Sequence, residues 1–217
     1  MSALATEDQL DRRTRRTRQA IKAAFVSLIL ERGYEAVTIL DVAKRADYNR
    51  GTFYKHFVGK EELLQEIRSE FLLGFAETLL IPYEGMDLVK AEDIYPSALQ
   101  LFNHIEKNKD EFQALLSVDR SFGFELYDVL RESMRRDMHI IMDEGSPALD
   151  YEIMLSYQMS AAIGVILYWE ESGFKYSTSY MADQLIGLVN RKMDKITFKK
   201  NVTSSSPTVS VYSPYNQ

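Results

Sequence analysis

Hydrophobic residues recur at intervals of three and four along most of the chain, and this spacing is typical of amphipathic α-helices. It predicts helices at residues 21–30, 39–46, 49–57, 60–80, 96–107, 110–116, 122–142, 149–171 and 177–195. Glycine and proline lie between several of these segments, where helices are expected to end. No stretch has the alternating β-branched pattern of a strand. The sequence therefore predicts an all-α protein of about nine helices.

The segment between residues 12 and 60 combines short helices with tight turns. A turn at residues 32–34 follows the first helix, and the short helix 39–46 is followed by Asp47-Tyr48 and the segment 49–57. That last segment carries basic and hydroxyl side chains. Two short helices joined by a tight turn form the helix-turn-helix layout, whose second helix fits the major groove of DNA. The pattern therefore predicts a three-helix DNA-binding domain.

Charge separates this segment from the rest of the chain. Residues 11–60 hold 12 Lys/Arg and 5 Asp/Glu, a net charge of +7, whereas the whole chain is at −6 and the other residues therefore carry −13. A basic N-terminal segment and an acidic remainder are expected to give the protein one surface that attracts DNA phosphates and another that repels DNA. A run of arginines by itself is usually a solvated, charged segment at a chain terminus. These arginines, however, lead directly into the helix-turn-helix pattern.

Composition bounds the remaining possibilities. The 217-residue chain has no cysteine, no apolar run long enough to span a membrane and a polar, basic N-terminus, which together predict a cytoplasmic protein. Its three histidines are scattered, and no phosphate loop or nucleophile motif occurs. We therefore expect no catalytic residue, metal or cofactor, and no membrane partner. The expected organisation is a flexible terminus (1–11), a DNA-binding domain (12–59), a helical body for effector binding and dimerisation (60–198) and a disordered tail (199–217).

The first of these domains resembles the N-terminal domain of the tetracycline-repressor (TetR) family of bacterial regulators. The matching residues are Ala23, Ala24, Phe25, Gly33, Tyr34, Thr38, Val42, Ala43, Ala46, Gly51, Thr52, Tyr54, Phe57 and Lys60 to Leu64. The rest of the chain is similar to the family in helical layout and length. Residues 168–173 also resemble the end of the penultimate helix in a subgroup that includes a dihydroxyacetone-pathway activator.

The resemblance implies an all-α homodimer in which each subunit presents one recognition helix to a half-site of a palindromic operator. It implies that Asn49 caps this helix, and that Thr38 and Lys60 bind flanking phosphates. The residues implied to face DNA are Arg50, Thr52, Tyr54, Lys55 and His56. Apolar residues beneath them, Val42, Tyr48, Phe53 and Phe57, are implied to support the helix. Tyr54 could instead be a half-buried ring, although its position opposite Phe53 and Phe57 favours the groove face.

Two residues depart from the family pattern, which often has glycine and then valine in the turn. Asp47 can adopt the left-handed conformation at more strain than glycine. Tyr48 is larger than valine, and its hydroxyl must reach a partner or solvent. We therefore expect the domain to be retained, with a helix geometry that need not copy the family's.

The body contains many aromatic residues at core-like spacing. The resemblance implies an effector pocket among its helices, and the candidate lining residues are Phe75, Phe102, Phe122, Tyr127 and Trp169. The alternative for each of them is plain core packing. A cavity in the body would favour a ligand-responsive protein, and a filled bundle with an exposed apolar patch would favour another form of control.

The last two long helices carry a stripe of apolar and small residues, which predicts a dimer interface. Its members are Tyr157, Ala161, Gly164, Val165, Tyr168, Leu185 and Leu188. The small residues would let a partner helix approach closely, although such a stripe could equally pack within the subunit. Half-site recognition by one helix-turn-helix usually needs two-fold symmetry, which favours the dimer.

These observations predict a sequence-specific DNA-binding regulator, with double-stranded DNA and a second copy of the chain as partners. The main hypothesis is a homodimeric repressor that a small-molecule effector releases from its operator. The alternative is a related regulator or activator that is controlled by a protein partner and has no small-molecule pocket.

Overall fold

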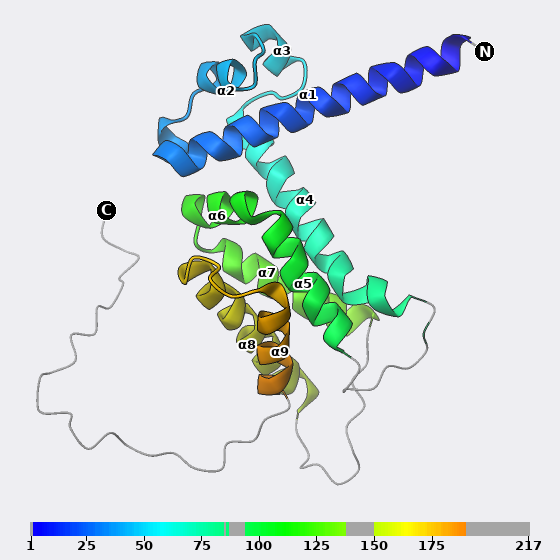
Figure 1. Ribbon diagram of the computed structural model, residues 1–217, viewed down its shortest axis with the longest axis vertical. Helices are drawn as coiled ribbons and strands as arrows, with labels where there is room; N and C mark the ends of the chain where they lie inside the picture. Colours follow the sequence, from blue (N-terminus) through cyan, green and yellow to red (C-terminus); the bar gives the residue numbers. More distant parts are fainter. Residues whose placement is uncertain (1, 85, 87–93, 138–149, 190–217) are drawn as a thin grey trace, which may run out of the picture.

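A computed structural model describes residues 2–84, 86, 94–137 and 150–189, and this part of the chain contains nine α-helices and no strand (Figure 1). The helices are α1 (Ser2–Arg32), α2 (Ile39–Arg45), α3 (Arg50–Tyr54), α4 (Lys60–Leu80), α5 (Tyr95–Lys107), α6 (Lys109–Val118), α7 (Phe122–Asp137), α8 (Tyr151–Glu171) and α9 (Thr178–Val189). Two short 3₁₀ turns, Tyr34–Ala36 and Ile81–Tyr83, follow α1 and α4. The predicted all-α fold is confirmed.

The first helix is the main difference from the sequence-based expectation. Hydrophobic spacing places its start at Ile21 and leaves residues 1–11 flexible, whereas α1 is helical from Ser2. The segment has no glycine or proline before Gly33, and alanine, leucine and glutamine favour the helix. Hydrophobic spacing identified only the part of α1 that packs against other helices. The expected helix ends near Met142 and Lys195, and the tail 199–217, lie outside the described residues.

The helices form two parts joined by one long helix. We call α1, α2 and α3 the head and α5 to α9 the body (Figure 1). The helix α4 starts beneath α3 and runs down into the body, where it packs against α5 and α7. Further contacts of α5 with α9 and of α7 with α8 complete the bundle. Any change in the tilt of α4 within the body therefore moves the head.

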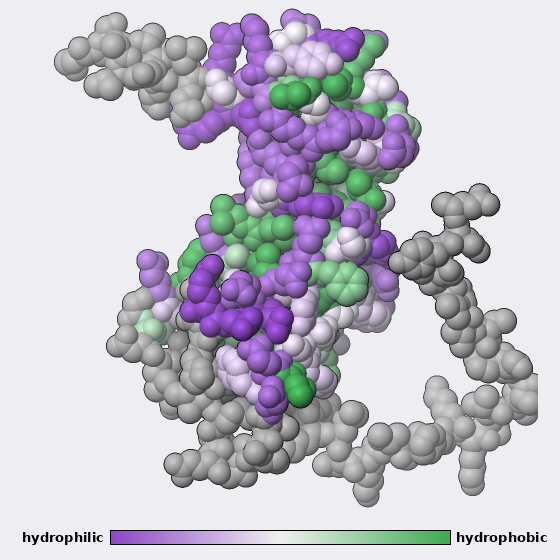
Figure 2. Space-filling view, turned by 180° about the vertical axis from the view of Figure 1, so that it is seen from behind, coloured by the Kyte–Doolittle hydropathy of each residue, from purple (hydrophilic) through white to green (hydrophobic). Residues whose placement is uncertain are grey.

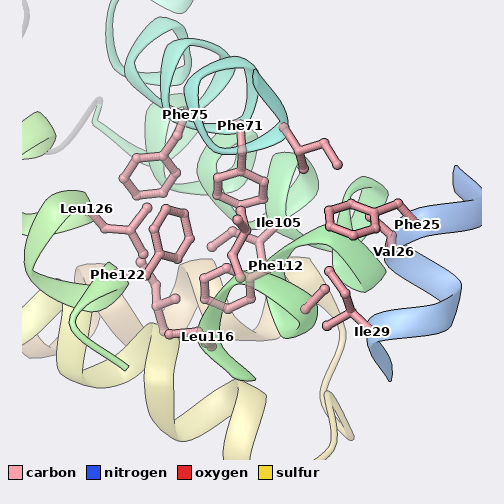
Figure 3. Close-up of a cluster of buried hydrophobic side chains, with 14 of the residues drawn as sticks. Phe25, Val26, Ile29, Phe71, Phe75, Ile105, Phe112, Leu116, Phe122 and Leu126 are labelled. Carbon is pink, nitrogen blue, oxygen red and sulfur yellow. The ribbon is translucent and has the colours of Figure 1, made fainter. Parts of the chain in front are cut away.

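One hydrophobic core extends from the body into the head. Figure 3 shows the rings of α4, α6 and α7 packed together and α1 side chains lying beside them. The ring of Phe71 stacks on that of Phe112 at 5.5 Å and meets the edge of Phe122 at 5.7 Å. On the head side, Val26 and Ile29 of α1 are buried in the same cluster. The head is therefore packed on the body through α1 and α6 as well as joined to it by α4.

The face of the molecule seen in Figure 2 is mainly hydrophilic, with separate hydrophobic patches on both head and body. In the described part of the chain, no helix is long and apolar enough to cross a membrane.

Candidate nucleic-acid interface

A capped helix begins the helix-turn-helix unit. Thr38 is the N-cap of α2, and its hydroxyl oxygen accepts a hydrogen bond from the backbone N–H of Asp41 at 3.2 Å. The Asp41 carboxylate in turn accepts from the backbone N–H of Thr38 at 3.1 Å. This reciprocal capping box satisfies two N–H groups that would otherwise lack partners. It explains why α2 begins at Ile39 despite being only seven residues long.

The turn between α2 and α3 accommodates both departures from the family pattern. Asp47 has φ +60°, the left-handed conformation expected of it. The Tyr48 hydroxyl accepts a hydrogen bond from the hydroxyl of Thr17 on α1 at 3.5 Å. Tyr48 therefore ties the turn to α1, and both expectations for these residues are confirmed.

Asn49 caps the recognition helix as expected. Its side-chain oxygen accepts a hydrogen bond from the backbone N–H of Thr52 at 2.8 Å. Below the helix, Val42, Phe53 and Phe57 are fully buried. The packing of these side chains fixes the position of α3 relative to α1 and α4. Regular α-helix ends at Tyr54, earlier than the predicted residue 57.

The outer face of α3 is polar and exposed. Arg50, Tyr54 and Lys55 are exposed, and the Tyr54 ring keeps 46% of its surface accessible. The guanidinium of Arg50 donates to the Tyr54 hydroxyl at 3.0 Å. Thr52 and His56 are half-buried at the edges of this face. The face offers donors, acceptors and a planar ring, which are the groups that contact base edges and phosphates.

His56 is the last of the residues implied to face DNA, and it contributes no charge. Burial lowers the pKa of His56, and the nearby charges of Arg18 and Lys55 lower it further. The imidazole is therefore neutral near pH 7 and can donate or accept a hydrogen bond.

Lys60 lies at the first turn of α4, at the lower edge of the head. Its ammonium group is 4.2 Å from the centre of the Tyr34 ring and donates to the Tyr34 backbone oxygen at 3.3 Å. Burial and the neighbouring Glu61 raise the pKa of Tyr34 to about 12, so this hydroxyl stays protonated. Lys60 is thus half-buried and positioned by Tyr34.

Two basic residues of α1 support the recognition helix in a way that the sequence did not reveal. The Arg18 guanidinium lies 4.4 Å from the Phe57 ring centre, donates to the His56 backbone oxygen at 2.8 Å and pairs with Glu66 of α4. Lys22, one turn further along, is buried and pairs with Glu66 at 2.6 Å. Their spacing of four residues could have indicated that these two share an inward face.

The Asn49 cap gives a first testable prediction. Asn49→Ala removes the side-chain acceptor at the start of α3, and the free energy of unfolding should fall by about 1 kcal/mol. DNA affinity should fall as well, because α3 frays at its first turn. Asn49→Ser is the matched control, since serine also accepts at this position. Chemical denaturation of the three proteins measures the difference, and equal stability of Asn49→Ala and the wild type would contradict the cap's role.

The structure places the residues expected to line an effector pocket mainly in the core. Phe75, Phe102, Phe122 and Trp169 are fully buried, and Tyr127 is half-buried. The Trp169 ring meets the edge of Phe102 at 5.4 Å, and its indole N–H donates to the Tyr176 backbone oxygen at 3.0 Å. These four side chains pack as core residues, which was the alternative for each of them.

An open groove of about 380 Å³ lies elsewhere, between α4 and α5. It is lined mainly by polar residues, namely Gly74, Glu77, Thr78, Ile81, Gln100, His104, Lys107 and Asn108. The Nε2 atom of His104 lies 3.1 Å from the Phe71 backbone oxygen, and burial lowers the pKa of this imidazole. A Cβ atom at Gly74 would lie 2.5 Å from the His104 ring, so glycine is needed for this close approach. None of the predicted pocket residues lines this groove.

The predicted dimer stripe lies mostly on the surface. Tyr157 is 73% exposed, Tyr168 53% and Leu188 57%. Ala161 and Gly164 are also exposed, and Val165 is half-buried. Leu185, by contrast, is buried in the core of its own subunit and offers no surface to a partner. The exposed stripe therefore consists of residues of α8 together with Leu188.

Comparisons with known proteins match both parts of the chain. Residues 21–67 match a family described as bacterial regulatory proteins of the tetR family, and residues 92–191 match a family described as a transcriptional regulator C-terminal region, TetR_C_8. The repressor KstR2 of Mycobacterium tuberculosis is 22% identical over 75% of this chain and 86% of its own length. A solved structure of the dihydroxyacetone kinase operon activator DhaS is 22% identical and has a TM-score of 0.57, covering 80% of this chain and 93% of DhaS.

Higher identity is confined to a shorter region. The uncharacterised regulator YxbF of Bacillus subtilis is 45% identical over 60 residues, which make up 27% of this chain. This chain spans only 16% of the length of YxbF. The similarity to DhaS agrees with the resemblance noted at residues 168–173.

Proposed function

Because the chain belongs to the TetR family of bacterial transcriptional regulators, we propose that it binds a palindromic operator as a homodimer. The observation that carries this proposal is the exposed polar face of α3, held by the Asn49 cap and by three buried apolar side chains. A helix presented in this way enters the major groove, where its side chains contact base edges. Each subunit would then recognise one half-site.

The dimer is proposed from the exposed stripe on α8. Tyr157, Ala161, Gly164 and Tyr168 follow one another at intervals of three and four residues and are all exposed in the single subunit. Contiguous apolar surface of this kind is typical of an association site. In a dimer, the two α3 helices would need to lie about 34–36 Å apart, or near a multiple of that distance, to reach the same face of DNA.

Control by a small-molecule effector is part of the proposal. The named relatives include both a repressor and an activator. KstR2 is named a repressor and DhaS an activator. Core packing of the four predicted pocket residues favours the alternative, in which a protein partner controls the regulator. An effector acts only if it binds the DNA-free form better than the bound form. We therefore propose a repressor that works in the cytoplasm, with release by such a ligand as one mode of control and a protein partner as the other.

Selection of bound fragments from genomic DNA tests the proposed function. The purified chain should enrich a small set of fragments that share an inverted repeat, and neighbouring genes would indicate the pathway. Enrichment of fragments without a shared sequence would contradict sequence-specific binding.

Salt dependence tests the expected phosphate contact of Lys60. Affinity for a selected fragment should fall steeply as salt rises, because counterions return to the DNA when the protein leaves. Lys60→Ala should flatten the slope of log affinity against log salt by about one unit and weaken binding to all sequences nearly equally. Lys107→Ala, on the exposed surface of the body, is the matched control. An unchanged slope would show that Lys60 only supports the Tyr34 loop.

A further inference from the structure

The open groove between α4 and α5 is formed by one side of each helix. Its lining residues recur every three or four positions, and residues at this spacing share one face of a helix. Those of α4 are Gly74, Glu77, Thr78 and Ile81, and those of α5 are Gln100, His104 and Lys107. The two helices pack side by side in the body (Figure 1). A molecule in the groove would therefore touch both helices at once.

His104 joins the two sides of the groove and carries no charge. Its Nε2 atom lies 3.1 Å from the Phe71 backbone oxygen, which can only accept, so Nε2 carries the proton and donates it. Its Nδ1 atom lies 3.3 Å from the side-chain nitrogen of Asn108, which can only donate, so Nδ1 accepts. Burial lowers the pKa of this imidazole. Both ring nitrogens are thus used within the protein, and the ring is neutral near pH 7.

With His104 neutral, the groove has one negative and one positive side chain. Glu77 belongs to α4 and Lys107 to α5, so the two charges come from opposite sides. Both lie within electrostatic reach of the same ring, because besides burial the charge of Lys107 lowers the pKa of His104 and that of Glu77 raises it. Among the described residues, neither side chain forms an ion pair or hydrogen bond. A carboxylate and an ammonium group are therefore both available to a ligand.

The size of the groove limits what it can hold. Its volume of about 380 Å³ equals that of roughly a dozen water molecules at about 30 Å³ each. Gln100 and Asn108 add amide groups to its lining, and Ile81 adds the apolar side chain. A small polar molecule fits such a space, and opposite charges on the two sides match a ligand that carries both signs.

We propose that this groove binds a small zwitterion of the amino-acid class, with the ligand's ammonium group at Glu77 and its carboxylate at Lys107. The proposal rests on the proposed function in its ligand-controlled mode. A ligand held at both ends would fix the spacing of α4 and α5. Glu77 lies about 25 Å along α4 from Lys60, at 1.5 Å per residue. A small change in the tilt of α4 at the groove is therefore enlarged at α3.

Calorimetric titration of the full chain with each of the common L-amino acids tests the ligand class. At least one should bind with a Kd below about 1 mM. The amine and the carboxylic acid that match this amino acid each lack one of its charges. Each should bind about 10-fold more weakly or worse, because a hydrogen bond to a charged group is lost. Failure of every amino acid to bind, or equal binding of the matching amine or acid, would overturn the proposal.

Two variants test the location of the site. Glu77→Gln and Lys107→Gln each remove one charge from an exposed side chain, and glutamine retains the helix. Each should weaken binding of the amino acid by about 10-fold or more. Glu132→Gln removes a carboxylate from the exposed surface of α7 and is the matched control, with the wild-type Kd expected. Wild-type binding by both groove variants would place the ligand elsewhere and overturn the assignment.

Operator binding at a saturating concentration of the amino acid tests the regulatory role. Affinity should fall by about 5- to 150-fold, the usual range of coupling between two sites. The same concentration should leave the affinity of Glu77→Gln closer to its ligand-free value. An amino acid that binds in the groove without changing operator affinity would overturn control from this site and leave the proposed DNA binding intact. A ligand-free chain that bound operator and random duplexes equally would instead overturn the proposed function.

Discussion

Gly164→Asp should split the dimer and lower operator affinity by on the order of 10²-fold or more, because two linked heads bind far more tightly than one. Gly164 is exposed on α8 in the middle of the proposed interface. A carboxylate there would be an unpaired charge in an apolar seam, which strongly disfavours association. A Cβ atom at this position meets nothing within 4 Å in the subunit itself. The subunit should therefore stay folded while the dimer is lost.

Sedimentation together with operator binding measures this effect. Gly164→Ala is the control, because it adds a methyl group without charge and also favours the helix. We expect monomers for the aspartate variant and dimers for the alanine variant, with circular dichroism showing equal helix content. A folded aspartate variant that remained dimeric would place the interface elsewhere on the body.

Trp169→Ala should destabilise the body by about 3–5 kcal/mol, the usual cost of removing a large aromatic ring from a core. The ring is completely buried, lies edge-on to Phe102 and Phe174, and bonds through its N–H to the Tyr176 backbone. Its loss removes contacts with α5 and with the turn before α9. Such a change is a large fraction of the stability of an ordinary domain.

Denaturant unfolding measures this second effect, with Trp169→Phe as the matched control. Phenylalanine retains a ring and should cost clearly less than alanine. If Trp169→Ala cost less than about 1 kcal/mol, the ring would border a cavity and not fill the core. Such a result would restore Trp169 as a pocket residue, and an altered effector response in the same variant would then support ligand control.

The head was more predictable from sequence than the body, because its short helices depend on local signals. Thr38 and Asn49 are capping residues whose hydrogen bonds involve groups only three residues away. The turn at Asp47 likewise follows from the conformations that one residue type can adopt. Local chemistry of this kind can be recognised in a single sequence.

The body depends on contacts between distant segments, and here sequence spacing left alternatives open. A ring that fills a core and a ring that lines a pocket have the same helical spacing, so Phe102 and Trp169 could be either. Leu185 shows the same ambiguity, since its position on the stripe did not reveal that it packs inward. Hydrophobic spacing also places the start of α1 too late, because residues 12–16 are exposed and give no such signal.

The central claim is that α3 recognises base sequence, and the ratio of two affinities tests it most directly. The wild-type chain is titrated, at one fixed salt concentration, with a selected operator duplex and with a scrambled duplex of equal length and composition. If α3 reads base edges, the ratio should be at least about 10³ in favour of the operator. Arg50→Ala should reduce that ratio by roughly 5- to 150-fold, equivalent to the 1–3 kcal/mol of a base contact. A wild-type ratio near one would contradict base recognition by α3.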